Sequence, residues 1–70
     1  MDQRTKKVYD FIKYYLEAHR GYAPSIREIA HGAYLGRSTI MRHLDKLEAW
    51  GLITREPNKA RSIRLTDRVR

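Results

Sequence analysis

Apolar residues recur at helical spacing in three successive segments of the chain and then switch to a two-residue alternation. The first segment predicts an amphipathic helix over about residues 3–20. Its stripe consists of Val8, Phe11, Ile12, Tyr15 and Leu16. Tyr9 and Tyr14 fall off this stripe, so we expect them to be half exposed. Gly21 predicts the end of the helix, because glycine readily adopts a left-handed conformation.

A second, shorter helix is predicted over about residues 25–33. Ser25 and Glu28 form the S-I-R-E pattern of a capping box, in which each side chain accepts a hydrogen bond from the other residue's backbone. The predicted buried face consists of Ile26, Ile29 and Ala30. Gly32 and Gly36 weaken the helix and predict a turn before the next element.

The third helix is predicted over about residues 38–50. Ser38 is the expected N-cap, with a start one residue earlier at Arg37 as the alternative. The predicted inner face consists of Ile40, Leu44 and Leu47. Gly51 predicts a left-handed stop, and Lys46 lies near the end, where a cation suits the helix dipole.

After Gly51, the segments "LITRE" and "SIRLT" predict two short strands, joined by the turn region "PNKAR". A hairpin over about residues 52–66 would be marginal alone and must pack on the helices. The expected contacts are Leu52, Ile53, Ile63 and Leu65. The pattern therefore predicts a single domain over residues 1–70, mainly α with a small antiparallel β-hairpin, in a three-helix winged helix-turn-helix arrangement.

Composition narrows the classes of protein that this chain can belong to. Its 70 residues include no cysteine, and His19, His31 and His43 show no ligand-like spacing, so we expect no metal and no cofactor. No paired carboxylates, activated nucleophile or phosphate-binding glycine loop suggests an enzyme. No apolar run reaches the roughly 18 residues of a membrane span, and "MDQRTKK" is not a secretory signal, so a cytoplasmic location is expected.

The charge favours an anionic partner. The net charge is +7, of which residues 1–34 contribute +2 and residues 35–70 contribute +5. Arginines dominate the second half, and their planar guanidinium groups suit phosphates and guanine edges. Double-stranded DNA is the expected partner.

The third helix is the expected recognition helix, because a major groove admits one helix whose first residues meet base edges. The candidate base contacts are Arg37, Ser38, Thr39, Met41 and Arg42. Ser38 as a simple cap and Met41 as an ordinary surface residue remain alternatives. The candidate backbone or wing contacts are Lys46, Lys59 and Arg61, with Lys59 and Arg61 expected at the hairpin tip. His43 is expected to be structural, with a phosphate contact as the alternative.

A protein-interaction module is the competing interpretation, since winged helices also serve as docking surfaces. Its apolar surface would come from Tyr9, Tyr14, Tyr22 and Trp50. RNA binding is less favoured, because the predicted strands carry no aromatic residue for stacking on bases.

Three segments, "GYAPSIREIA", "STIMRHLDKLEAWGLI" and "REPNKARSIRL", resemble the N-terminal DNA-binding domain of LexA repressors. The resemblance implies a bacterial repressor of the SOS response to DNA damage that binds a palindromic operator as a dimer. It implies base contacts by Ser38, Thr39, Met41 and Arg42, and backbone contacts by Asn58, Lys59 and Arg61.

The chain departs from the family pattern in the turn before the third helix. This turn is about one residue shorter, and Leu35-Gly36-Arg37-Ser38 replaces the usual Gly-Leu-Ser-Ser. The serine–lysine self-cleavage module of LexA proteins does not occur in these 70 residues, so we expect no enzymatic activity. The chain is then either an excised domain or a stand-alone relative.

Overall fold

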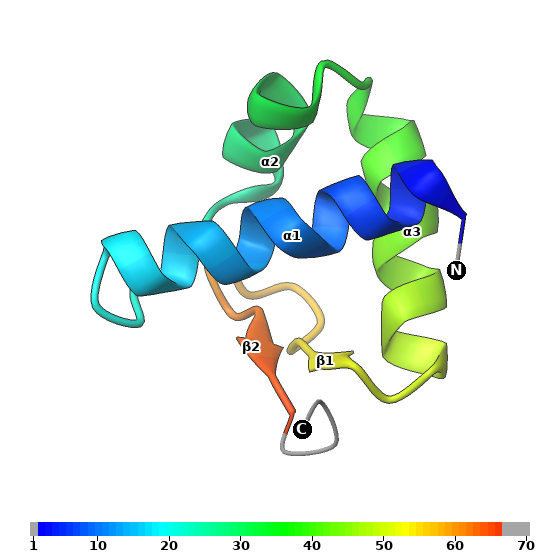
Figure 1. Ribbon diagram of the computed structural model, residues 1–70. Coiled ribbons are helices and arrows are strands. Elements are labelled where there is room, and N and C mark those ends of the chain that lie inside the picture. Colours follow the sequence, from blue (N-terminus) through cyan, green and yellow to red (C-terminus); the bar gives the residue numbers. More distant parts are fainter. Residues whose placement is uncertain (1, 67–70) are drawn as a thin grey trace.

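Three helices and a two-stranded antiparallel sheet make up the computed structural model, which describes residues 2–66 (Figure 1). The elements are α1 (Gln3–Ala18), α2 (Ile26–Ala33), α3 (Arg37–Ala49), β1 (Ile53–Thr54) and β2 (Arg64–Leu65). The predicted fold class, a three-helix winged helix-turn-helix with a small hairpin, is confirmed. The predicted domain also included residue 1 and residues 67–70, which lie outside the described part.

Helix α1 ends two residues earlier than predicted. Asp2 caps its start by accepting a hydrogen bond from the Thr5 backbone N–H at 2.8 Å. At the other end, Arg20 and Gly21 both have positive φ, at 55° and 87°. The Gly21 N–H donates to the Leu16 carbonyl at 2.7 Å, so the left-handed stop begins one residue before the predicted glycine.

Helix α2 has the predicted capping box. The Ser25 Oγ accepts from the Glu28 N–H at 3.1 Å, and Glu28 Oε1 accepts from the Ser25 N–H at 2.9 Å. Gly32 lies inside α2, within the predicted helix of about residues 25–33, and Tyr34 takes the left-handed position after the helix at φ 57°. Gly32 lets α2 approach α1, since a Cβ there would overlap the ring of Phe11.

Helix α3 spans Arg37–Ala49, so it starts and ends one residue earlier than predicted. Ser38 as the N-cap is wrong, and the alternative of Arg37 as the N-cap is also wrong: Gly36 is the N-cap, and no side chain caps the helix. Gly36 has extended backbone angles, and its carbonyl accepts the first helical bond from the Ile40 N–H at 3.0 Å. At the far end Gly51 has the predicted left-handed conformation, with φ 77°.

The core lies where the three helices meet and continues under the sheet. Its buried residues are Val8, Tyr9, Ile12, Ile29, Ala30, Ala33, Ile40, Leu44, Leu47, Ile53 and Ile63. The predicted half-exposure of Tyr9 is wrong, because its side chain is 6% exposed against this core. Tyr14 is exposed, as its place off the stripe indicated.

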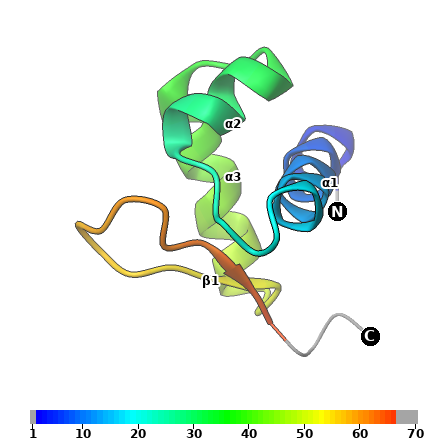
Figure 2. The same ribbon diagram turned by 90° about the vertical axis from the view of Figure 1, so that its left-hand side faces the viewer.

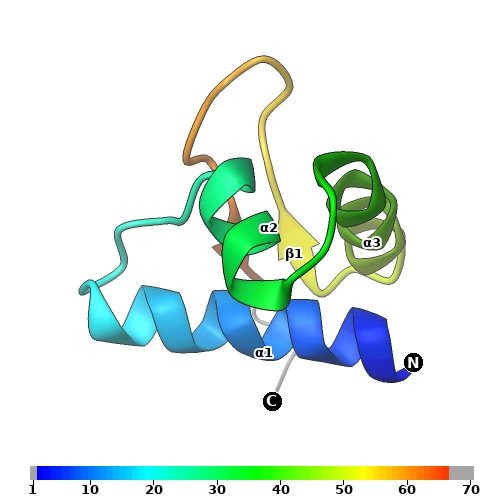
Figure 3. The same cartoon turned by 90° about the horizontal axis from the view of Figure 1, so that it is seen from above.

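The wing, defined as residues 53–65, contains shorter strands than predicted. Ile53 pairs with Leu65 and Thr54 with Arg64, and the sheet ends there. Ile53 and Ile63 pack in the core, whereas the expected contact from Leu65 is weak, since 38% of its surface is exposed. The loop between the strands reaches beyond α2 and α3 on the side opposite α1 (Figures 2 and 3).

Candidate nucleic-acid interface

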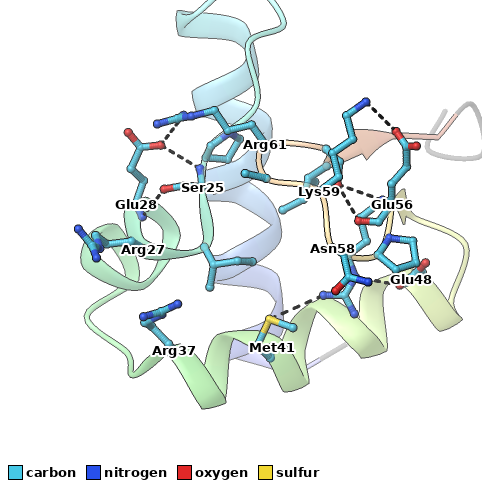
Figure 4. Close-up of a pocket in the computed structure, with 17 residues that line it drawn as sticks. Ser25, Arg27, Glu28, Arg37, Met41, Glu48, Glu56, Asn58, Lys59 and Arg61 are labelled. Carbon is cyan, nitrogen blue, oxygen red and sulfur yellow. Dashed lines mark hydrogen bonds and ion pairs between the residues drawn. The ribbon is translucent and has the colours of Figure 1, made fainter.

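An open groove of about 990 Å³ lies between the start of α2, one side of α3 and the wing (Figure 4). Its charged lining consists of Arg27, Glu28, Arg37, Glu48, Arg55, Glu56, Lys59 and Arg61. Five cations therefore face three carboxylates. The cations outnumber the carboxylates, and this balance suits a polyanion.

The outward face of α3 carries four of the five predicted base contacts. Arg37, Ser38 and Arg42 are exposed, and Met41 is 42% exposed. Ile40 and Leu44 on the opposite face are fully buried, so the core fixes which side of α3 points outward. The structure thus presents a cationic, partly apolar ridge next to the groove.

Thr39 is not part of this ridge. It is half-buried and lies about 200° around the helix from Arg37, on the flank that also carries Lys46. The Lys46 Nζ lies 3.3 Å from a carboxylate oxygen of Asp2, at the start of α1. Thr39 is therefore less exposed than the other four candidate residues, and its contact with a base stays a prediction.

His43 has the structural role that was preferred for it. Its side chain is 6% exposed, and Nδ1 lies 2.8 Å from the Oγ1 of Thr5, which is fully buried. This hydrogen bond joins α1 to α3 across the core. His43 is therefore placed to hold the recognition helix rather than to face a ligand.

The wing separates its two predicted cations. Lys59 is 65% exposed and pairs with Glu56 at 3.2 Å, next to Asn58, whose backbone is left-handed with φ 59°. Arg61 does not extend from the tip, so that expectation is wrong. Its Nη1 lies 2.8 Å from Glu28 Oε1 and 3.1 Å from the Ala23 carbonyl, and its guanidinium lies 5.0 Å from the centre of the Tyr22 ring.

The contact with Arg61 controls the ionisation of Glu28. Hydrogen bonds from Arg61 and from the Ser25 backbone lower the pKa of Glu28 from 4.5 to about 2. Tyr15 also donates to the same oxygen, at 3.2 Å. Glu28 is therefore a carboxylate across the physiological range, and its charge is matched by that of Arg61.

Sequence reasoning missed Arg27 and Arg55. Arg27 is the second residue of α2, exposed at the groove, and the S-I-R-E capping box could have revealed it, since it places this side chain in the first turn. Arg55 pairs with Asp45 and Glu48 of α3, the latter at 2.9 Å. No local pattern signals that pairing, because it depends on how the wing packs.

Three arginines at this surface have no partner within residues 2–66. Arg27, Arg37 and Arg42 make no hydrogen bond, ion pair or ring contact there. By contrast, Arg55, Lys59 and Arg61 all pair with carboxylates of the chain. The unpaired guanidinium groups are the ones available to an external anion.

The described residues fit other kinds of site to different degrees. In the described part of the chain, no three His, Asp or Glu side chains form a group that could hold a metal ion. The helices in this part lack the length and apolarity needed to cross a membrane. Of the four aromatics expected to form a docking surface, Tyr9 is buried, whereas Tyr14, Tyr22 and Trp50 are exposed.

Comparison with known proteins agrees with this geometry. Residues 1–62 match the family described as the LexA DNA binding domain. The chain is 46% identical over 69 residues to the LexA repressor of an Exiguobacterium species, covering 96% of the chain and 33% of that repressor. It is 41% identical over 64 residues to the LexA repressor of Koribacter versatilis, covering 90% of the chain and 30% of that repressor.

The chain thus spans about a third of the length of the relatives that it matches. The family match covers nearly all of the winged helix-turn-helix, including α3 and most of the wing. From the fold, the cationic face of α3 and this match, we conclude that the chain belongs to the LexA DNA-binding domain family, whose domain type implies binding to DNA.

Proposed function

We propose that this domain reads a specific double-stranded DNA sequence by placing α3 in the major groove and the wing beside the adjacent backbone. The observation that carries the proposal is that Arg27 and Arg37, which line the groove, and Arg42, on the outward face of α3, are exposed and have no partner within residues 2–66. A duplex supplies both the phosphates and the guanine edges that such groups bind.

The positions on α3 suggest separate roles. Arg42 and Arg37 suit bidentate contacts with guanine, Ser38 suits a base edge or a phosphate, and Met41 suits a thymine methyl group. Thr39 and Lys46, on the other flank, suit the backbone of the groove wall. These roles make α3 the source of sequence specificity.

Three further residues suit phosphates rather than bases. Arg27 lies in the first turn of α2, where the helix dipole also favours an anion. Asn58 and Lys59 lie in the exposed loop of the wing. Contacts of this kind set the orientation of the domain on the duplex but carry little sequence information.

We further propose that the domain serves a bacterial transcriptional repressor of the SOS response, acting on a palindromic operator at the nucleoid in the cytoplasm. The support is that the matched relatives are named LexA repressors. Half-sites one helical turn apart are separated by about 34–36 Å. The domain measures 27 × 24 × 23 Å, so two copies fit on such half-sites without overlap.

Selection of bound duplexes from a random pool tests both parts of the proposal. A palindromic enriched motif with half-sites one turn apart is the expected result. An enriched single half-site would refute the paired arrangement while retaining sequence reading. No retardation of any duplex in a low-salt gel shift would refute DNA binding and favour the protein-interaction module.

A further inference from the structure

Three carboxylates of α2 and α3 lie close to the surface proposed to meet DNA. Glu28 is at the start of α2, and Asp45 and Glu48 are on the wing side of α3. Their side chains are 37%, 68% and 44% exposed, so none is hidden from an approaching phosphate. Without a nearby cation, each of these carboxylates would repel a polyanion.

Two arginines of the wing pair with these three carboxylates and offset two of their three negative charges. Arg61 holds Glu28 at 2.8 Å and also donates to the Ala23 carbonyl, which ties the returning half of the wing to the segment before α2 (Figure 4). Arg55 holds Glu48 at 2.9 Å and also pairs with Asp45, which ties the outgoing half of the wing to α3. The wing is therefore fastened on both sides of the groove.

Both guanidinium groups are turned toward the protein. The Arg55 side chain is only 16% exposed and that of Arg61 only 33%, against 65% for Lys59 on the same loop. Arg55 Nη1 also lies 4.0 Å from the Met41 sulfur, on the ridge of α3. A phosphate contact by either arginine would require it to leave these partners.

We propose that Arg55 and Arg61 are positioning residues that fix the wing beside the recognition helix and offset the negative charge of Glu28, Asp45 and Glu48, without contacting phosphate themselves. The inference rests on the proposed DNA binding. It gives the wing cations two different roles. Lys59 contacts the DNA backbone, whereas Arg55 and Arg61 pair with carboxylates of the protein.

The test compares four forms of the chain in salt-dependent titrations with a random duplex: the starting protein, Arg61→Gln, Arg61→Gln with Glu28→Gln, and Arg61→Gln with Glu17→Gln. Glutamine at position 28 retains an oxygen for the capping box and for an amide hydrogen bond. Glu17 on α1 does not line the groove, so its double variant has the same net charge but keeps the carboxylate of Glu28.

Arg61→Gln should lower affinity about fivefold, the effect of like charges about 4 Å apart in bulk water. The double variant with Glu28→Gln should recover the affinity and the salt slope of the starting protein, whereas the Glu17 control should stay weak. If Arg61 contacts a phosphate, the Glu28 double variant stays weak and its salt slope is shallower by about 0.9. That result would overturn the inference.

The starting protein separates this inference from the proposed function. If it fails to bind, the proposed function and the inference fall together; if it binds but the Glu28 double variant does not recover, only the inference falls. Arg55→Gln with Asp45→Asn provides a second pair on the other side of the wing, so a variant that does not fold leaves the other pair to decide. This double variant should have the same salt slope as the starting protein. A shallower slope would overturn the inference for Arg55.

Discussion

The buried hydrogen bond between Thr5 and His43 makes the stability of this domain depend on one hydroxyl group. Thr5 is fully buried, His43 is 6% exposed, and the Oγ1–Nδ1 distance is 2.8 Å. Thr5→Val keeps the shape of the side chain but replaces the hydroxyl with a methyl group. The imidazole nitrogen then loses its partner in a place that water does not reach.

Leaving such a polar atom unpaired costs about 1–3 kcal/mol of unfolding free energy. For a domain of this size, each kcal/mol corresponds to a fall in Tm of about 4–8 °C. Thermal and urea unfolding followed by circular dichroism should show this loss with an unchanged urea m-value. The matched control is Thr54→Val, at an exposed threonine on β1, which should stay within about 0.5 kcal/mol.

A double variant makes the test of this hydrogen bond stricter. Thr5→Val with His43→Leu removes both polar partners, so its loss of stability should be smaller than the sum of the two single losses. A Thr5→Val protein as stable as the starting protein would refute the reasoning. Additive losses in the double variant would show that the two side chains do not act as a pair.

Three more predictions follow from single positions. Arg42→Ala should weaken the binding free energy for the selected site by about 1–3 kcal/mol and relax specificity at one base pair. Competition titrations against random DNA measure this change, with Lys13→Ala on α1 as the control. An equal loss of affinity for both DNAs would exclude base reading. Gly32→Ala should lower the unfolding free energy by about 1 kcal/mol, because displacing the Phe11 ring outweighs the better helix propensity of alanine; a rise in Tm would contradict this. Glu28 has a pKa lowered to about 2, so its ionised form stabilises the fold fully above about pH 4.5, and this contribution disappears as the pH falls toward 2. The urea midpoint of Glu28→Gln should therefore be lower than that of the starting protein above pH 4.5 and converge with it near pH 2. A difference that stays constant with pH would refute the lowered pKa of Glu28.

Several features of this domain could be predicted because they depend on residues close together in the chain. The helical stripes, the Ser25–Glu28 capping box and the left-handed Gly51 involve neighbours within about one turn. The same holds for the outward exposure of Met41 and Arg42, since Ile40 and Leu44 define the opposite face of α3. Even so, the start of α3 differed from the prediction, because Gly36 and not the stronger capping residue Ser38 is the N-cap.

The sequence by itself therefore determined which segments become helices and which side of α3 faces outward. Only the tertiary structure decided which arginines are available to DNA. Arg61 meets Glu28 across 33 positions and Thr5 meets His43 across 38, so neither pairing leaves a local pattern. The physical reason is that a cation's partner depends on where packing brings the nearest carboxylate, whereas the face of a helix depends only on spacing along the chain.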